Sequence, residues 1–365
     1  MFSEKDLQQL LEYSAEGEVL SVYLNTNPSQ INTEAAKLWL RNALKPVDLP
    51  EDVQAVENFV NLEYDWLGKG LAIFSNQKEN YFNTYQFNLS LPNEVDVNER
   101  PVIRPLAHLL DTFMGWGVVL VDRQQARIFS FDLGELTERD LFEGDEIKQL
   151  KRGGGTAVLG QRGSGDVSAK IGSIIDRNIK EMIDSAVNFF EQHRIRRIML
   201  GGTDDNIARF RDALPKSWQS LIVGSFPMSM AATQTEVLEQ ATKEALATQD
   251  HVNRSLIEQS ITLSAKGNHG VTGLIDTLNM IHEGRVRTLL VMHDFEQTGF
   301  RCDGCGYLTV QELHKCPFCG GSFKRIDRAV EMAVEETLRK NAEVKVIHDS
   351  EALTGAGRIT AILRY

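Results

Sequence analysis

The four cysteines constrain the fold more than any other feature, because all of them lie in the short stretch RCDGCGYLTVQELHKCPFCGG. Their spacing is Cys302-x2-Cys305-x10-Cys316-x2-Cys319. Two such CxxC pairs bring four thiolates within reach of one tetrahedral ion, and Zn²⁺ is the usual ion at a site of this kind. The glycines that follow the cysteines suit tight turns around the metal. The spacing therefore predicts a zinc ribbon over residues 301–322 with Zn²⁺ as a structural cofactor.

Two disulfides or a redox pair are the alternatives to zinc. The N-terminus, MFSEKDLQQLLEYSAEGE, is acidic and lacks the basic segment followed by an apolar segment that marks a secretory signal. A cytoplasmic location is therefore expected, and stable disulfides are rare there. Because four cysteines fill a tetrahedral site, the metal is expected to fold the ribbon and not to bind substrate.

Length and charge limit the function classes. A chain of 365 residues has room for two or three domains. No apolar run of about 18 residues occurs, so we expect no membrane partner. The net charge of −12 argues against a protein that coats nucleic acid through general electrostatics.

The order of helix and strand patterns predicts an α/β fold with three α/β domains. They are expected at residues 1–112, 113–266 and 267–365. In the first domain, helix and strand patterns fall at 2–13, 19–26, 34–44, 70–76 and 81–91. In the second they fall at 117–122, 126–136, 167–190, 196–202, 205–214, 220–226 and 235–265. In the third they fall at 273–286, 287–292, 326–340, 344–349 and 359–365, with the cysteine stretch inserted between a strand and a helix.

A glycine-rich basic stretch, KRGGGTAVLGQRGSGD, precedes the long helix pattern of the second domain. Its segment 153–165 holds six glycines and is flanked or interrupted by Lys151, Arg152 and Arg162. Ten Lys/Arg against five Asp/Glu occur between Lys148 and Arg197, although the whole chain is acidic. Positive charge is thus concentrated around this loop, while the helix charges also fit a solvated face with i,i+4 pairs.

The loop does not fit a nucleotide-binding motif. Gly155-x4-Gly160 matches the start of a P-loop, but Gln161 and Arg162 stand where the motif requires Lys and then Ser or Thr. The lysine for the β- and γ-phosphates and the hydroxyl for magnesium are both missing. We therefore expect no nucleotide at this loop.

These features together resemble the bacterial branch of the archaeo-eukaryotic class I peptide release factor and Pelota superfamily. The stretch GVVLVDRQQARIFSFDLGEL, the basic glycine loop, the long helix and RRIMLGGTDDNIARFRDALP are similar to the central domain of that family. VTGLIDTLNMIHEGRVRTLLV and GAGRITAILRY are similar to its C-terminal domain, which resembles kink-turn-binding ribosomal proteins. An inserted zinc ribbon also fits several members.

The resemblance implies a role for the loop. In release factors of this family a Gly-Gly-Gln loop enters the ribosomal peptidyl-transferase centre and promotes hydrolysis of peptidyl-tRNA. This sequence has Gly160 and Gln161 at the corresponding place, with Leu159 where a second glycine would stand. A backbone N–H there could stabilise the oxyanion, and the amide could position water.

Two functions follow from the resemblance. In the first, the chain binds the ribosome in the A site, like Pelota, and rescues or protects idle (hibernating) ribosomes, with a translational GTPase as a further partner. In the second, it hydrolyses peptidyl-tRNA with Gln161. Both imply contact with rRNA and peptidyl-tRNA through the basic residues Lys151, Arg152, Arg162, Lys170 and Arg177. A soluble α/β protein with no ribosomal role is the remaining alternative.

Overall fold

The computed structural model describes residues 2–13, 17–144 and 164–365, without the side chains of 136–139 and 164–171. The chain divides into two compact units. The terminal unit comprises Met1–Thr112 and Gln249–Tyr365, and the central unit is Phe113–Thr248. Each unit contains mixed helices and strands, so the predicted α/β class is confirmed. The three predicted domain boundaries stay a prediction.

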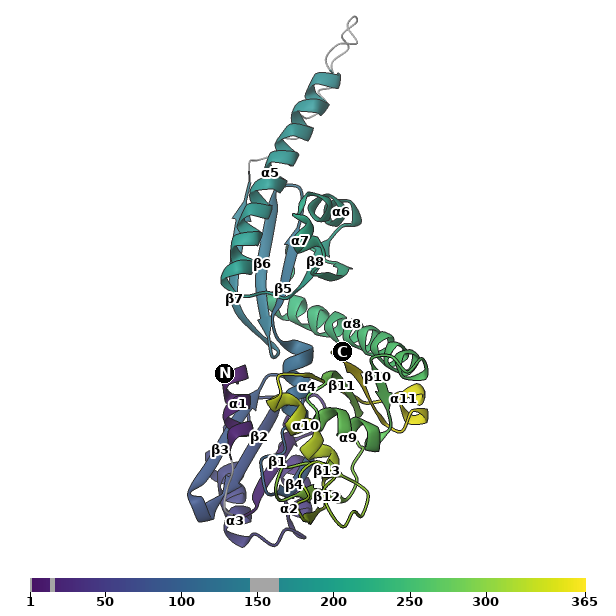
Figure 1. The fold of residues 1–365 in the computed structure, drawn as a ribbon. Helices are drawn as coiled ribbons and strands as arrows, with labels where there is room; N and C mark the ends of the chain where they lie inside the picture. The colour runs from purple at the N-terminus through teal and green to yellow at the C-terminus, as the bar shows by residue number, and fades with distance from the viewer. Residues whose placement is uncertain (1, 14–16, 145–163) are drawn as a thin grey trace, which may run out of the picture. The chain divides into compact units, whose positions relative to one another are not determined.

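The N-terminal part of the terminal unit is built on an antiparallel sheet in the order β3-β2-β1-β4 (Figure 1). Apolar residues on one of its faces, such as Val22 and Ile73, pack against Leu40 and Val56 of the two covering helices. The elements are α1 (Glu4–Glu12), β1 (Val19–Asn25), α2 (Thr33–Leu44), α3 (Pro50–Asn58), η1 (Phe59–Glu63), β2 (Gly70–Asn76), η2 (Gln77–Glu79), β3 (Tyr81–Phe87), β4 (Glu94–Asn98) and α4 (Arg104–Phe113).

The segment NERPVIRPL differs from its sequence interpretation. Its two prolines indicated a connection out of the domain, but β4 ends at Asn98 and α4 begins at Arg104. Pro105 is the second residue of α4. A proline in the first helical turn interrupts no intrahelical hydrogen bond, so it marks the start of this helix.

The C-terminal part of the terminal unit has a sheet in the order β10-β16-β11-β15. The pair β11 and β15 is parallel, and the other two pairs are antiparallel. Helices α9 and α10 supply buried residues to one apolar core, while the second half of α8 and α11 supply them to another. The elements are α8 (Gln234–Ala265), β10 (Gly270–Thr272), α9 (Leu274–His282), β11 (Val286–Met292), β12 (Gly299–Cys302), β13 (Leu308–Thr309), β14 (Phe323–Ile326), α10 (Ala329–Arg339), β15 (Glu343–Ile347), α11 (Glu351–Gly355) and β16 (Ile359–Leu363).

The cysteine stretch forms a small sheet of its own, in the order β13-β12-β14. It leaves the larger sheet after β11 and returns to it through α10, so the predicted insertion between a strand and a helix is confirmed.

Buried ion pairs join the two parts of the terminal unit. Arg104 is 6% exposed, and its guanidinium pairs with Glu296 at 3.0 Å and with Glu331 at 2.9 Å. It also donates to the carbonyl oxygens of His293 and Phe295. The carboxylate of Glu331 is fully buried, and it also accepts the backbone N–H groups of Ile103 and Arg104. The start of α4 is therefore held by residues from the other end of the chain.

Arg104→Met is expected to lower the free energy of unfolding of the terminal unit by about 3–5 kcal/mol, because it leaves the buried carboxylate of Glu331 without its cation. Denaturant unfolding measures this change. Lys324→Met is the matched control: its pair with Glu99 spans the same two segments, but both side chains are about half exposed or more. The control is expected to cost less than about 1 kcal/mol. Equal losses in the two variants would contradict a stabilising role for Arg104.

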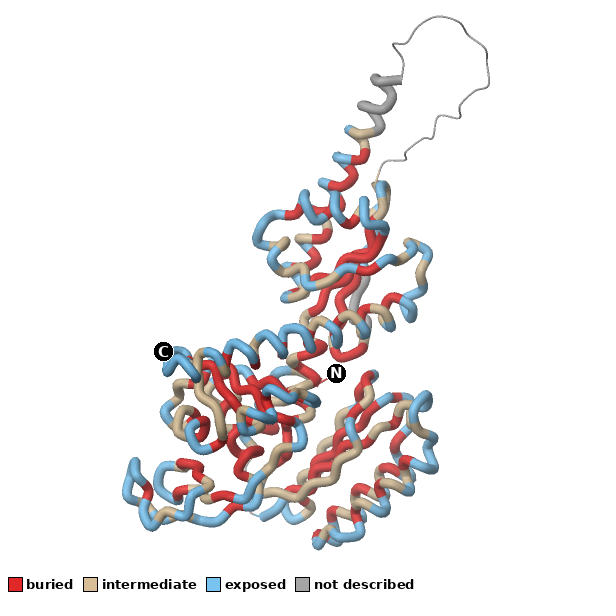
Figure 2. The backbone as a smooth tube through the Cα atoms, turned by 90° about the vertical axis from the view of Figure 1, so that its right-hand side faces the viewer, coloured by how far each residue is buried: buried red, intermediate tan, exposed pale blue. Residues whose placement is uncertain are grey.

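The central unit has a five-stranded sheet in the order β7-β6-β5-β8-β9. Val119, Ile128 and Leu200 of this sheet share an apolar core with α5 and α6. The neighbouring strand residues Val118, Leu120 and Phe129 are buried as well, so both faces are covered (Figure 2). The elements are β5 (Trp116–Val121), β6 (Gln125–Asp132), β7 (Glu135–Glu143), α5 (Ser164–Gln192), β8 (Arg197–Gly202), α6 (Asp204–Ala213), α7 (Lys216–Gln219), β9 (Ile222–Pro227) and the start of α8.

The strand expected at 126–136 is divided in the structure. A turn at Leu133 and Gly134, both with positive φ, ends β6 and starts β7. Among the described residues, no helix is long and apolar enough to cross a membrane.

Candidate functional site

The glycine loop connects β7 to α5 at one edge of the central sheet. Strands β7, β5, β8 and β9 all point the same way, because β5 and β7 both pair antiparallel with β6, and β8 and β9 continue in parallel. Their carboxyl ends therefore meet at one edge. Open α/β sheets commonly place their binding loops at this edge.

Two residues, one after β7 and one in the middle of α5, bind the β5–β6 turn. Asn178 of α5 is fully buried, and its amide donates to the carbonyl of Arg123 at 3.4 Å. Gly144, directly after β7, donates its N–H to the carbonyl of Gln124 at 2.8 Å. A Cβ on Gly144 would lie 2.6 Å from Cγ of Asn178, so only glycine allows this close approach. These contacts thus hold the end of β7 and the middle of α5 close to the β5–β6 turn.

Sequence reasoning missed both anchors. The signal for Asn178 was present, because an asparagine stands at a position where the apolar spacing of α5 calls for a buried residue, between Ile175 and Met182. Gly144 lies in a polar stretch, and nothing local distinguishes it from an ordinary loop glycine.

Helix α5 extends well past this anchor point. Ser164 begins the helix and Asn178 lies fourteen residues later, which at about 1.5 Å per residue is about 20 Å of helix. Figure 1 shows this part of α5 projecting beyond the end of the central sheet. Among the described side chains of α5, the buried ones begin at Ile175. The connection between β7 and α5 is therefore joined to α5 about 20 Å from the core.

Most of the predicted loop residues lie outside the described part of the chain. These are Lys151, Arg152, Gly160, Gln161 and Arg162. Lys170 lies within α5, in the stretch whose side chains are not described.

Arg177 is exposed on α5, next to the buried Asn178. The exposed residues around it carry both signs of charge: Lys180 is positive, whereas Asp176, Glu181 and Asp184 are negative. This part of α5 fits the solvated helix face that the sequence also allowed. Any net basic character of the site therefore depends on Lys151, Arg152, Arg162 and Lys170.

The four cysteines come together in the ribbon. The Sγ atoms of Cys302 and Cys319 are 3.4 Å apart, those of Cys305 and Cys316 are 3.5 Å apart, and all four lie within 4.8 Å of one another. Four sulfurs at about 2.3 Å from one Zn²⁺ would be about 3.8 Å apart. All four thiols are free. The cluster therefore has the size of a tetrahedral metal site.

The backbone around the sulfurs is built in two matching turns. The N–H of Gly306 donates to the carbonyl of Cys302 at 3.0 Å, and the N–H of Gly320 donates to the carbonyl of Cys316 at 2.8 Å. Both glycines have φ near +75°, a conformation that suits glycine. Each CxxC pair thus forms the tight turn that the sequence predicted.

Two further glycines leave room for the sulfurs. A Cβ on Gly304 would lie 3.0 Å from Sγ of Cys319, and one on Gly321 would lie 3.1 Å from Sγ of Cys302. The N–H of Cys305 lowers the pKa of Cys302 to about 6, which favours its thiolate, whereas burial raises the pKa of Cys305. A thiolate is the form that binds metal. The residues present therefore fit a metal ion bound by four sulfurs.

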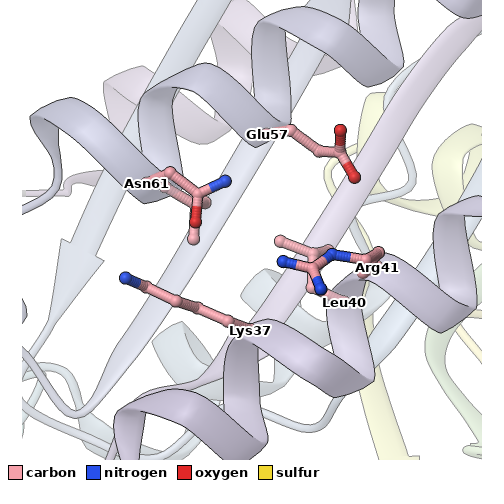
Figure 3. Close-up of a pocket in the computed structure, with 6 residues that line it drawn as sticks. Lys37, Leu40, Arg41, Glu57 and Asn61 are labelled. Carbon is pink, nitrogen blue, oxygen red and sulfur yellow. The ribbon is translucent and has the colours of Figure 1, made fainter.

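A groove lies between α2 and α3 in the terminal unit (Figure 3). Lys37 and Arg41 enter it from α2, and Glu57 and Asn61 enter it from the opposite helix segment. The ammonium of Lys37 also lies 5.4 Å from the ring centre of Trp66. Because charges of both signs line the groove, it favours no ligand class, and no sequence motif indicated it.

A comparison with known protein families matches the middle of the chain. Residues 101–246 match the family model of bacterial archaeo-eukaryotic release factor family 10. This segment of the chain is therefore similar to a bacterial release-factor family. The matched segment contains α4 and nearly all of the central unit, including the connection from β7 to α5. The resemblance predicted from the sequence is thus confirmed.

The individual proteins that are similar to this chain share at most 24% sequence identity with it in the three cases that follow. Peptide chain release factor subunit 1 of Methanocaldococcus jannaschii is 24% identical over 311 residues, which cover 72% of this chain and 69% of that protein. An archaeal Pelota, in a model bound to the ribosome with ABCE1, is 12% identical with a TM-score of 0.38, covering 100% of this chain and 94% of that one. Dom34 of S. cerevisiae, which interacts with Hbs1, is 10% identical with a TM-score of 0.42, covering 100% and 91%.

Proposed function

We propose that this protein is a ribosome-binding translation factor that enters the A site with its loop 153–165 directed toward the peptidyl-transferase centre. There it acts in ribosome rescue or in the protection of idle ribosomes. The match of residues 101–246 to the bacterial release-factor family carries the proposal. Such a factor acts in the cytoplasm and takes rRNA, peptidyl-tRNA and a translational GTPase as partners.

The geometry of the central unit supports this role. Gly144 and Asn178 anchor the connection at the edge of the sheet, and α5 extends about 20 Å beyond them. A narrow helical support of this length can carry a loop into a confined site, while the sheet stays outside. The residues that would contact RNA are Lys151, Arg152 and Arg162, together with Lys170 and Arg177 of α5.

Occupancy of the site is favoured over hydrolysis as the action of the loop. Hydrolysis of the peptidyl-tRNA ester requires the backbone to approach the reacting atoms closely. Leu159 places a bulky side chain next to Gly160 and Gln161, where release factors have bare glycine backbone. Hydrolysis by Gln161 is the second candidate function, because the amide itself is present.

Zinc is proposed as the ion of the ribbon. The sulfur-to-sulfur distances, the two glycine turns and the space left by Gly304 and Gly321 all support four-sulfur coordination. Cys302, Cys305, Cys316 and Cys319 would hold the ion, which would stabilise the ribbon and leave no position for substrate.

The proposed RNA contact predicts a salt effect. Replacing Lys151, Arg152 and Arg162 together with alanine is expected to weaken ribosome binding and to reduce the slope of log K against log salt by about 2 to 3, because three phosphate contacts no longer release counterions. Co-sedimentation with ribosomes over a series of salt concentrations measures the slope.

The control replaces Lys69, Lys78 and Lys266, three exposed lysines of the terminal unit, and so makes the same change in net charge. It is expected to leave the slope nearly unchanged. If the two triple variants behave alike, or neither differs from the wild type, the loop does not provide the RNA contact.

A further inference from the structure

One face of α4 is polar and is bound by the C-terminal part of the terminal unit. Arg104, His108 and Asp111 follow at i, i+4 and i+7, so they lie on one side of the helix. Arg104 pairs with Glu296 and Glu331, and Asp111 pairs with Lys345. His108 lies between these two ion pairs and packs on another histidine. Contacts from a distant segment thus hold α4 along its length.

Three histidine rings lie against one another at the middle of this face, one pair edge to face and the other tilted. The ring centres of His108 and His348 are 4.9 Å apart, and those of His348 and His293 are 4.8 Å apart. His293 directly follows β11 and His348 directly follows β15. Because β11 and β15 are parallel neighbours, the two residues sit side by side at the carboxyl ends of these strands.

We propose that His108, His293 and His348 form an acid-sensitive latch. While His108 is neutral, the latch holds α4 against the ends of β11 and β15. When His108 is protonated, the latch releases α4. The proposal concerns the terminal unit only and does not depend on the ribosomal function.

The surroundings of His108 disfavour its charged form. The pKa of His108 is lowered to about 4, mainly by burial and then by His348, His293 and Lys345 in that order of effect. Burial also lowers the pKa of His348, followed by the effect of His293, while Asp250 of α8 opposes the shift. A proton on His108 would therefore lose much of its hydration and would be repelled by the ammonium of Lys345.

The neighbouring carboxylates already have cationic partners. Asp111 accepts from Lys345 and from the side chain of Gln249 at 2.8 Å. Asp294 lies 3.8 Å from Nδ1 of His293 and pairs with Arg358 at 2.5 Å. Asp250 acts on His348 but is not among the groups that act on His108. Burial, His348, His293 and Lys345 all lower the pKa of His108, and no carboxylate is among these effects.

The direction of the pH effect follows from the lowered pKa of His108. In the released state the imidazole titrates near its ordinary value of 6.5, while in the closed state it titrates near 4. Above pH 6.5 both states are neutral and the latch has its full stability. As the pH falls from about 6.5 toward 4, only the released state takes up the proton, so opening becomes more favourable.

Hydrogen exchange of the α4 amides in the full-length protein tests the latch. Between pH 7.5 and pH 5.5 the protection factor, corrected for intrinsic exchange, is expected to fall about tenfold in the wild type, as one proton is linked to opening. In His108→Gln, which keeps a polar side chain but cannot be protonated, the fall is expected to be within about twofold. His251→Gln, at an exposed position on α8, is the control and is expected to behave as the wild type.

A wild type whose α4 protection does not change over this range would overturn the proposal. A His108→Gln variant with the same tenfold fall would overturn it as well. If His108→Gln is unprotected at both pH values because packing is lost, His348→Gln decides. That change removes the neighbouring imidazole and raises the pKa of His108, so the fall in protection is expected to be smaller than in the wild type. If the protection factor of His348→Gln falls as much as that of the wild type, the proposal is overturned.

Discussion

Replacing Cys302 with serine is expected to release one Zn²⁺ per chain and to unfold the ribbon of β12, β13 and β14. The sulfur of Cys302 is buried in the cluster and lies 3.4 Å from that of Cys319. Structural zinc sites carry apparent binding energies of about 10 kcal/mol or more, and this energy is coupled to folding. The core of the small ribbon sheet consists of Cys302, Tyr307 and Cys316. Few other buried residues could therefore stabilise the ribbon once the metal is lost. Elemental analysis and thermal unfolding measure both effects.

Glu312→Gln is the matched control, because Glu312 is an exposed residue of the same insert. It is expected to keep the metal and the melting temperature of the wild type. A wild-type protein that is fully folded and contains no metal would contradict the zinc site. So would a Cys302→Ser variant that keeps one equivalent of zinc.

The damage is expected to spread into the terminal unit but not into the central unit. The ribbon is bound to α9 by the hydroxyl of Tyr307, which donates to Oδ1 of Asn279 at 2.5 Å. It also leads directly into α10, which carries the buried Glu331. The central unit has its own apolar core. Hydrogen exchange of α10 and of β5 in the same variant separates the two effects.

Much of the fold could be predicted from the sequence, because the patterns that set it are local. The cysteine spacing gave the ribbon and its place between β11 and α10. Apolar spacing gave α5 and the strands of the central sheet. The prediction was wrong at 98–106, where the prolines were interpreted as a connection although β4 ends and α4 begins there. A proline in the first turn of a helix gives the same sequence signal as a proline in a linker.

The buried contacts of the terminal unit could not be predicted. Arg104 and Glu331 are separated by 227 positions, and each taken alone looks like an exposed helix residue. Only the tertiary fold brings them together and excludes water from the pair. The histidine cluster also forms only in the tertiary fold, since His108, His293 and His348 come from three separate parts of the chain. Periodicity detects the face that an element buries, but not the partner that covers it.

The candidate site shows a similar division. The loop composition and the resemblance to release factors predict a role for Gly160 and Gln161. The length of helix beyond the sheet, by contrast, depends on where α5 meets Gly144, which only the structure shows. The function of the loop residues stays a prediction, and it can be tested directly.

Deleting residues 153–165 is expected to abolish ribosome protection, whereas Gln161→Ala is expected to leave it nearly intact. If the loop acts by occupying the peptidyl-transferase centre, its bulk matters and the amide of Gln161 does not. If instead the amide serves the transition state, Gln161→Ala lowers peptide release about 10²–10³-fold without weakening ribosome binding. Single-turnover release from stalled ribosomes, measured beside co-sedimentation, separates the two actions.

Leu159→Gly is the most informative companion, because it creates the Gly-Gly-Gln sequence of release factors at positions 159–161. On the occupancy hypothesis, Leu159 blocks the approach of the backbone to the ester. The variant is then expected to gain release activity that the wild type lacks, and the double variant with Gln161→Ala is expected to lose it again. Release by the wild type well above background, abolished by Gln161→Ala alone, would overturn the occupancy hypothesis and establish the hydrolytic one. Full ribosome protection by the deletion variant would contradict both, since each requires the loop.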